Sequence, residues 1–447
     1  MAHLDYRDRY CIPSQDQEAG SEVAGRSVSR GQDQGELFAA TATQITPQGK
    51  LSPKRPRVET AGLADVFPYY AGFSFDWAVS HLTPHLGGES TVVLDPWNGS
   101  GTTTLAAQSL GVPSVGLDLN PIANVVAHLR AQVASSTRIT NPPRARKRSA
   151  SVAADPLSHW LSPSLVTRVR EWTDSFTRQR RDVSTLGIVA LFRVVRRLTK
   201  DFEGSNPTWV RRASEIDMLV DLPHSEFDKL LLDDQRQLLD RLQGNSAPKA
   251  PVALLTGSST NLPIADCSVD VTLTSPPYLT RIDYAVAYAR ELAICGIDIA
   301  ADRTLRSGLM GTTLIRRPTG TSSNTLYCPL ADDLVRQIAG HGSKASSGYY
   351  LKQARQYLDD LVASFDEITR VSKPGAVLIM VVQDSYYKEI PIRLADICEE
   401  EAKSRGWSFS SREQFEVVRS LTSIHAQART YPKGKVSETV LTLRKEV

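Results

Sequence analysis

The stretch STVVLDPWNGSGTTTLAAQSLG, residues 90–111, decides the fold. A short apolar run typical of a buried strand leads into a loop with two glycines, Gly99 and Gly101, and then into a helical pattern. The next stretch, PSVGLDLNPIANVVAHLRAQV at 113–133, again gives a strand, an acidic strand end and a helix with Pro121 in its first turn. Two consecutive strand–loop–helix units predict a parallel, doubly wound α/β sheet.

The rest of the chain extends this sheet. We expect further strands at 252–257, 268–274 and 376–382, and a terminal antiparallel pair at 409–419 and 437–445. The predicted fold class is therefore α/β, with a doubly wound, Rossmann-like sheet, a terminal antiparallel strand pair and a helical insert.

The chain divides into three parts. Residues 1–61 are rich in Gln, Ser, Gly, Arg and Asp without periodicity, which predicts a disordered N-terminal arm. Residues 62–135 and 250–447 carry the sheet pattern and form the predicted catalytic domain. Residues 136–249 are a predicted helical insert with several amphipathic helices.

Charge is uneven within the insert. Residues 136–200 hold 14 Lys and Arg against 4 Asp and Glu, a net charge of +10. Residues 201–250 hold 6 against 10. This asymmetry suggests a face for an acidic partner, with Arg193, Arg196 and Arg197 as predicted phosphate contacts. A helical scaffold or dimer surface is the open alternative.

A polar interruption rich in Gly, Ser and Thr covers about 301–348 and carries Arg303, Arg306, Arg316 and Arg317. Two interpretations are open. The segment either closes over a nucleic acid or forms a disordered surface excursion.

Composition excludes several classes of protein. The net charge of +3 means that any nucleic-acid surface is local. No stretch reaches the roughly 18 apolar residues that span a bilayer, so we expect no membrane association. Five scattered cysteines without a C-x-x-C pair fit a reducing cytoplasm and no zinc site, and His128 and His341 lack metal-ligand spacing.

The glycine-rich loop has its own chemistry. A dinucleotide fingerprint needs a third glycine where Thr104 stands, and a phosphate-binding Walker loop needs a lysine that is missing. A ligand with an amino-acid end fits better, because Asp95 accepts from an ammonium group. Asp118, at the next strand end, accepts from the hydroxyls of a ribose. An amino acid and a ribose on one molecule point to S-adenosyl-L-methionine, with Gly99, Gly101 and Thr102 beside it.

The loop DPWNGSGTT at 95–103, followed by TSPPY at 274–278, resembles the amino-methyltransferases that methylate exocyclic amines of DNA bases. The segments FPYYAGFSFDW at 67–77, LPIADCSVD at 262–270 and VSKPGAVLIMVVQDS at 371–385 match this family more loosely. The resemblance implies a methyltransferase fold and assigns Ser258, where the family commonly has aspartate, to the cofactor site.

The TSPPY segment explains why two prolines follow a buried strand. In this family the strand exit receives a base flipped out of the duplex. Ser275 and the carbonyl of Pro276 are expected to accept the hydrogens of the amine, and Pro277 holds that carbonyl rigidly. Tyr278 is expected to stack on the base. No metal is implied.

Ser275 is the first residue of the SPPY part of this motif. A serine there favours N4 of cytosine in double-stranded DNA, since the family uses aspartate or asparagine at that position more often for N6 of adenine. The alternatives are an adenine-N6 enzyme, an RNA base-amine methyltransferase and a non-catalytic DNA-binding protein. The resemblance also implies a role in restriction–modification or a related defence system in the prokaryotic cytoplasm, near the nucleoid. A cognate restriction nuclease or another defence protein is the expected partner, and the insert stands where one class of these enzymes carries its target-recognition domain.

Overall fold

The computed structural model describes most of the chain beyond the N-terminal arm. The described residues are 52–53, 63, 65–69, 72–87, 90–132, 134, 137–144, 154–204, 210–244, 250–279, 282–316, 326–343, 346–416 and 436–447. The predicted disordered arm, 1–61, lies outside them except for Ser52 and Pro53.

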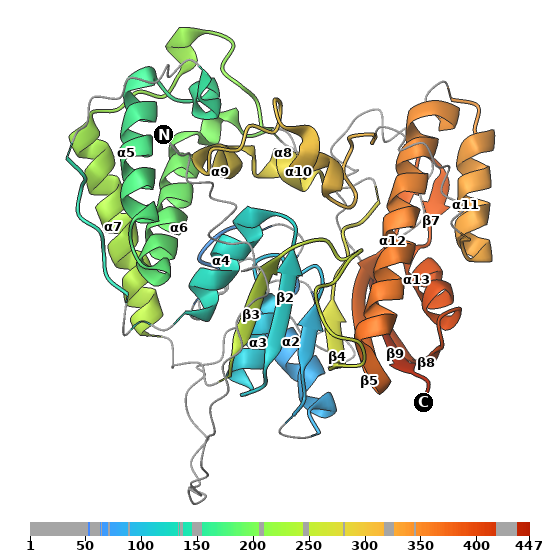
Figure 1. Cartoon of the computed structure of the whole chain (residues 1–447). Helices are drawn as coiled ribbons and strands as arrows, with labels where there is room; N and C mark the ends of the chain where they lie inside the picture. The colour runs from blue at the N-terminus through green and yellow to red at the C-terminus, as the bar shows by residue number, and fades with distance from the viewer. Residues whose placement is uncertain are drawn as a thin grey trace, which may run out of the picture.

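A seven-stranded sheet in the order β3-β2-β1-β4-β5-β9-β8 forms the centre of the molecule (Figure 1). Its strands are β1 (Val93–Asp95), β2 (Ser114–Asp118), β3 (Val252–Thr256), β4 (Val269–Thr274), β5 (Ser372–Gln383), β8 (Trp407–Glu416) and β9 (Ser437–Lys445). Strands β1 to β5 run parallel, and β9 is antiparallel to both β5 and β8. The predicted doubly wound sheet with a terminal antiparallel pair is confirmed.

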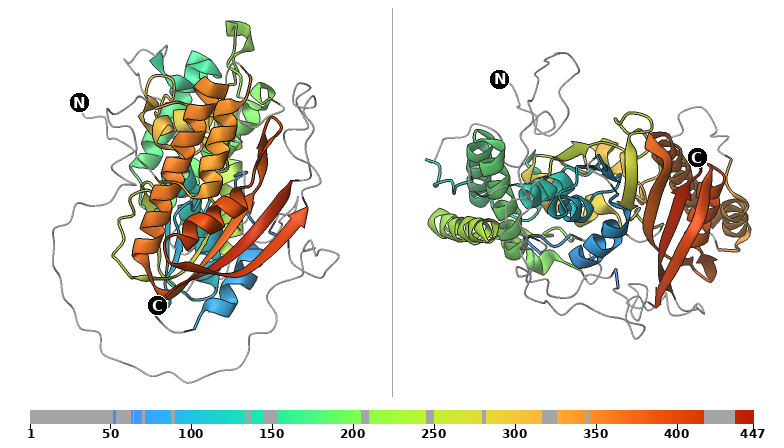
Figure 2. Two further views of the ribbon diagram at one scale, coloured as in Figure 1. Left: turned by 90° about the vertical axis from the view of Figure 1, so that its right-hand side faces the viewer. Right: turned by 90° about the horizontal axis from the view of Figure 1, so that it is seen from below.

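Helices cover both faces of this sheet (Figures 1 and 2). The longer helices of the described residues are α2 (Phe75–Leu82), α3 (Thr102–Ser109), α4 (Pro121–Ala131), α5 (Pro163–Thr177), α6 (Arg181–Leu198), α7 (His224–Gln243), α11 (Pro329–Gly340), α12 (Leu351–Val371) and α13 (Leu394–Lys403). Odd-numbered residues of β5 from Val377 to Val381 pack with α2 and α3. Even-numbered residues from Leu378 to Val382 pack with α12 and α13. The continuous apolar run of β5 therefore reflects burial on both faces.

The predicted helical insert forms a layer beside the sheet. Helices α5, α6 and α7 share one hydrophobic core with α4 and with α9 (Ala289–Ile294), which follows the TSPPY segment in the chain. Trp172 on α5 and Phe192 on α6 are fully buried in that core. Helix α4 begins at Pro121, shortly after the candidate site residue Asp118. The insert packs against α4 and so supports the position of this helix.

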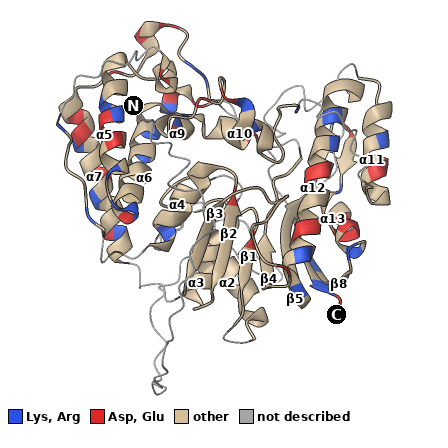
Figure 3. Ribbon diagram, viewed as in Figure 1, with Lys and Arg blue, Asp and Glu red and all other residues tan. Residues whose placement is uncertain are grey.

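The three arginines predicted to contact phosphates each pair with an acidic side chain. Arg193 and Arg197 on α6 lie 2.9 and 2.8 Å from the two carboxylate oxygens of Asp234 on α7, and Arg196 lies 2.9 Å from Glu291. Both carboxylates are buried. Arg193 and Arg196 are therefore unsuited to phosphate contacts, because each is largely buried and pairs with an acid inside the fold. Arg197, whose side chain is 52% exposed beside Asp234, stays a predicted phosphate contact. Figure 3 shows both signs of charge on α5, α6 and α7.

Several regular elements were absent from the sequence-based prediction, among them a helix inside the polar interruption and a short hairpin. Helix α11 lies inside the interruption at 301–348, with Pro329 in its first turn, and packs its apolar side into the core under α12. A small hairpin, β6 (Ser385–Tyr387) and β7 (Ile390–Ile392), follows β5. The described part of 301–348 is therefore no disordered excursion. The helix was missed because its short amphipathic pattern lies within a stretch rich in glycine and serine.

No helix among the described residues is both long enough and apolar enough to cross a membrane.

Asp234→Ala should reduce the free energy of unfolding by about 3 kcal/mol, because the change leaves Arg193 and Arg197 without their buried partner. Asp233→Ala is the matched control. Asp233 is the neighbour of Asp234 in the chain, but its side chain is 47% exposed and pairs with Arg236 on the surface. Chemical denaturation of both variants measures the difference. Equal stability would show that the α6–α7 ion pairs do not hold the insert together.

Candidate functional site

The candidate site lies where the chain reverses direction across the sheet. Strands β1, β2 and β3 succeed one another toward one edge, and β4 then pairs with the other side of β1. The carboxyl ends of these parallel strands share one edge of the sheet, and the reversal between β1 and β4 opens a crevice there. The glycine-rich loop, Asp118, Ser258 and Ser275 follow or end the four strands at this edge.

One pocket collects most of the predicted site residues. Seven of the ten line it, namely Asp95, Gly99, Thr102, Asp118, Ser258, Ser275 and Pro277. Gly101, Pro276 and Tyr278 are not on its lining. The cofactor loop and the TSPPY exit, about 180 residues apart in the chain, therefore face the same space.

Asp95 joins three elements at the floor of the pocket. Its carboxylate accepts from the Thr103 hydroxyl of α3 at 2.6 Å and from the Thr274 hydroxyl of β4 at 2.5 Å. The Trp97 amide also donates to it, at 3.1 Å. Asp95 is only 3% exposed. These contacts fix the start of the glycine-rich loop and leave little of the carboxylate free for a ligand.

Asp118 holds the middle of the same loop. One oxygen accepts from the Gly99 amide at 2.9 Å, and the other accepts from the Asn120 amide at 2.8 Å. Its side chain is only partly buried, so each oxygen keeps acceptor capacity toward the pocket.

Both carboxylates have perturbed proton affinity. Burial raises the pKa of Asp95 to about 6, against the lowering effect of hydrogen bonds from Thr103, Thr274 and Trp97. Burial likewise raises the pKa of Asp118 to about 6, against hydrogen bonds from Asn120 and Gly99. Among the described residues that line the pocket, none is Lys, Arg or His. The pocket therefore favours a cationic or hydrogen-donating ligand and disfavours a phosphate.

The two loop glycines have different roles. Gly99 has φ +51°, and a Cβ there would lie 3.0 Å from the Tyr69 ring. Gly101 has φ +83°, and a Cβ there would lie 2.9 Å from Cβ of Ala127 on α4. Gly101 therefore allows α3 and α4 to come into close contact, and its place beside the cofactor stays a prediction.

The TSPPY exit is held from behind by α12. The hydroxyls of Ser275 and Tyr278 are hydrogen-bonded at 3.1 Å, and the Tyr357 hydroxyl donates to the Pro277 carbonyl at 2.8 Å. Pro276 is buried. Ser275 therefore faces the pocket from a fixed backbone, whereas base stacking by Tyr278 and acceptance by the Pro276 carbonyl stay predictions.

Several lining residues carried no signal in the sequence. Tyr69 stacks on Tyr288 with ring centroids 4.9 Å apart, and Tyr284 also reaches the pocket. Asp360 arrives from the middle of α12, and 308–310 arrive from the polar interruption. Tyr69 belongs to the segment 67–77 and residues 308–310 belong to the polar interruption, both singled out beforehand, but neither was assigned to the site. No spacing rule places the others, because they reach the pocket through tertiary packing.

Comparison with known proteins gives one relative in sequence. The chain is 24% identical over 380 residues to the Type II methyltransferase M.BsoBI of Geobacillus stearothermophilus, covering 71% of this chain and 73% of that protein. No protein-family model matches the chain.

Solved structures with similar folds include methyltransferases. A SAM-dependent methyltransferase from Methanosarcina mazei is 10% identical with a TM-score of 0.30, over 82% of this chain and 97% of its own. The rRNA methyltransferase aviRa from Streptomyces viridochromogenes is 11% identical with a TM-score of 0.28, over 87% and 94%.

Gly101→Ala should destabilise the fold by about 2 kcal/mol, because the added methyl group meets Ala127 and the backbone is strained. Gly111→Ala is the control, since it has a similar φ of +75° but open space around a Cβ. Thermal unfolding of both variants separates packing from backbone strain. If the two variants melt together, close packing of α3 on α4 is not what requires Gly101.

Proposed function

We propose that this protein is an S-adenosyl-L-methionine-dependent methyltransferase that modifies the N4 amine of cytosine in double-stranded DNA. The observation that carries the proposal is the shared pocket, in which the glycine-rich loop and the Ser275–Pro277 exit lie together. The similarity to a Type II methyltransferase supports methyl transfer as the reaction class.

The charge of the pocket fits this cofactor. S-adenosyl-L-methionine carries a sulfonium and an ammonium group, and the lining holds partly buried carboxylates with no basic side chain among the described residues. Asp118 would accept from ribose hydroxyls, while Asp95 acts mainly through its negative charge because its hydrogen bonds are internal. Ser258, at the end of β3, offers a hydroxyl to the nucleoside end. When bound, the cofactor supplies a methyl group activated as an electrophile by its positive sulfur.

Residues of this chain favour the nucleophilic form of the target amine. The lone pair of an exocyclic amine is delocalised into the base, so an acceptor for its hydrogens favours the nucleophilic form. The Ser275 hydroxyl is such an acceptor, and its contact with Tyr278 sets its direction. The Tyr357–Pro277 hydrogen bond keeps the exit rigid, so that placement requires little reorganisation during transfer.

DNA binding rests on surfaces beyond the pocket. The proposed target-recognition role for 136–249 remains, but Arg193 and Arg196 are unsuited to phosphate contacts because they pair internally. A cognate nuclease in a restriction–modification system is the proposed partner, as part of the same proposal.

Incubation of DNA with the protein and S-adenosyl-L-methionine should yield N4-methylcytosine in a nucleoside digest analysed by mass spectrometry. Ser275→Ala should lower kcat roughly a hundredfold with little effect on cofactor affinity, since the lost acceptor matters most as the amine becomes nucleophilic. Ser408→Ala, an exposed serine on β8 away from the pocket, is the control.

The digest also separates the alternatives. N6-methyladenine as the sole product would overturn the cytosine assignment while keeping the cofactor site. An unmodified digest from diverse DNA would contradict the proposed activity and favour an RNA substrate or a non-catalytic role.

A further inference from the structure

A single segment spans the mouth of the pocket. Residues 303–316, here called the strap, comprise α10 (Arg303–Gly308) and the chain that follows it. Gly308, Leu309 and Met310 line the pocket opposite the glycine-rich loop. At Gly311, a Cβ would lie 3.5 Å from both Pro277 and the Tyr278 carbonyl. The strap therefore touches the cofactor pocket and the TSPPY exit at once.

Asp283 fastens the strap on one side. This buried carboxylate accepts from the Thr313 hydroxyl at 2.8 Å, from the Arg306 guanidinium at 3.0 Å and from the Thr312 hydroxyl at 3.2 Å. Its other oxygen caps α8 (Tyr284–Ala287), whose first residue lines the pocket.

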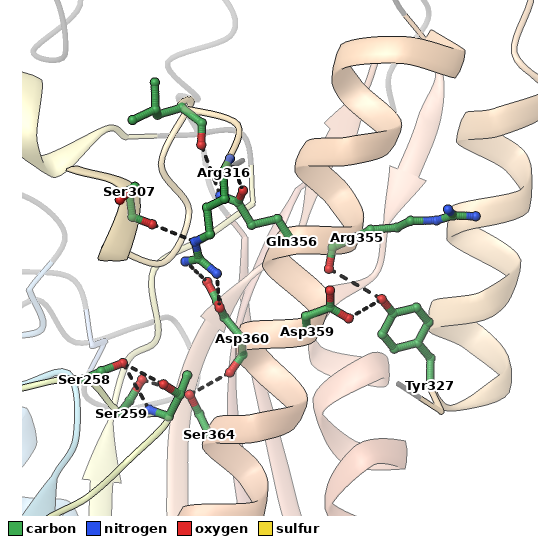
Figure 4. A network of polar contacts seen from close by, with 12 residues as sticks. Ser258, Ser259, Ser307, Arg316, Tyr327, Arg355, Gln356, Asp359, Asp360 and Ser364 are labelled. Atoms are coloured by element: carbon green, nitrogen blue, oxygen red, sulfur yellow. Dashed lines mark hydrogen bonds and ion pairs between the residues drawn. The ribbon is translucent and has the colours of Figure 1, made fainter. Parts of the chain in front are cut away.

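Asp360 on α12 fastens the strap on the other side (Figure 4). The Arg316 guanidinium donates to both of its oxygens at 2.6 Å, and Nε of Arg316 donates to the Ser307 carbonyl at 2.6 Å. The Arg316 amide donates to Gln356 at 2.9 Å. Arg316 thus folds the end of the strap back on its beginning and ties both to α12.

Asp360 not only holds the strap but also lines the pocket. Its main-chain carbonyl accepts from the Ser364 hydroxyl at 2.7 Å, and that hydroxyl lies 2.8 Å from the hydroxyl of Ser259. Figure 4 shows this chain of contacts running from Arg316 through Asp360 to the loop after β3. The Asp360 carboxylate therefore links the strap to α12, and Ser364 on the next turn of the helix links α12 to the loop that carries Ser258.

We infer that Arg316 and Asp360 are positioning residues for cofactor binding, because their ion pair holds the strap as one wall of the pocket. This inference rests on the proposed function, since it takes S-adenosyl-L-methionine as the ligand. The planar guanidinium of Arg316 pairs with both oxygens of Asp360, which fixes the orientation of the two groups as well as their distance. A lysine at position 316 cannot reproduce this two-point contact. Loss of Arg316 would release the end of the strap from α12, while Asp283 still holds its other side, and would leave a buried carboxylate unpaired beside the ligand.

Calorimetric titration with S-adenosyl-L-methionine tests the inference. Arg316→Ala should weaken affinity roughly tenfold, and Arg316→Lys should fall between it and wild type. Arg412→Ala is the control, because it removes the ion pairs of a partly exposed arginine on β8 with Asp396 and Glu399 of α13, away from the pocket. Steady-state assays should show a raised KM for the cofactor with a smaller change in kcat.

A measurement on the unaltered protein covers the case in which Arg316→Ala does not fold. Bound cofactor should slow amide hydrogen exchange at 307–314 in wild type. Equal affinity of wild type, Arg316→Ala and Arg316→Lys, or unchanged exchange of the strap in a cofactor-saturated protein, would overturn the inference. Failure of wild type itself to bind the cofactor would instead contradict the proposed function on which the inference rests.

Discussion

Two carboxylates at the ends of adjacent parallel strands, the buried Asp95 and the partly buried Asp118, organise this structure. Asp95 ties the glycine-rich loop to α3 and β4 through two threonine hydroxyls, and Asp118 ties the same loop to β2 through the Gly99 amide. Burial of a carboxylate is unfavourable unless hydrogen bonds compensate it. These hydrogen bonds therefore fix the conformation of the loop beside the crevice that the strand order opens between β1 and β4.

The same constraint sets the chemistry of the site. A pocket with raised carboxylate pKa values and no basic residue on its described lining attracts positive charge and hydrogen donors. Ser275 enters that pocket from the neighbouring strand, so under the proposed function a methyl donor bound over the glycine-rich loop would lie next to a hydroxyl suited to accept from an amine. The strap adds a third wall through Asp283 and Asp360. Acidic residues thus hold both the glycine-rich loop and the strap, which line the same pocket.

The sequence predicts the parts of the site that depend on local pattern. Strand ends, the glycine-rich turn and the TSPPY exit follow from hydrophobic runs and from glycine and proline, and seven of the ten predicted residues line the pocket. Contributions from distant packing are not predictable in this way. Asp360 is one acid among several on α12, and the charges of Arg193 and Arg196 suggest a surface until Asp234 and Glu291 are placed beside them. Gly101 was recognised for its backbone freedom, but its neighbour Ala127 is known only from the fold.

Titration of the protein with S-adenosyl-L-methionine between pH 5 and pH 8, in wild type and Asp118→Ala, tests the central claim most directly. Both carboxylates have a pKa of about 6 in the fold, so they are mostly protonated at the acidic end and charged at the other. Wild-type affinity should therefore rise as the pH increases through about 6, and Asp118→Ala should bind roughly tenfold more weakly at pH 8. Equal affinity of the two proteins at pH 8, with no dependence on pH in wild type, would contradict the account.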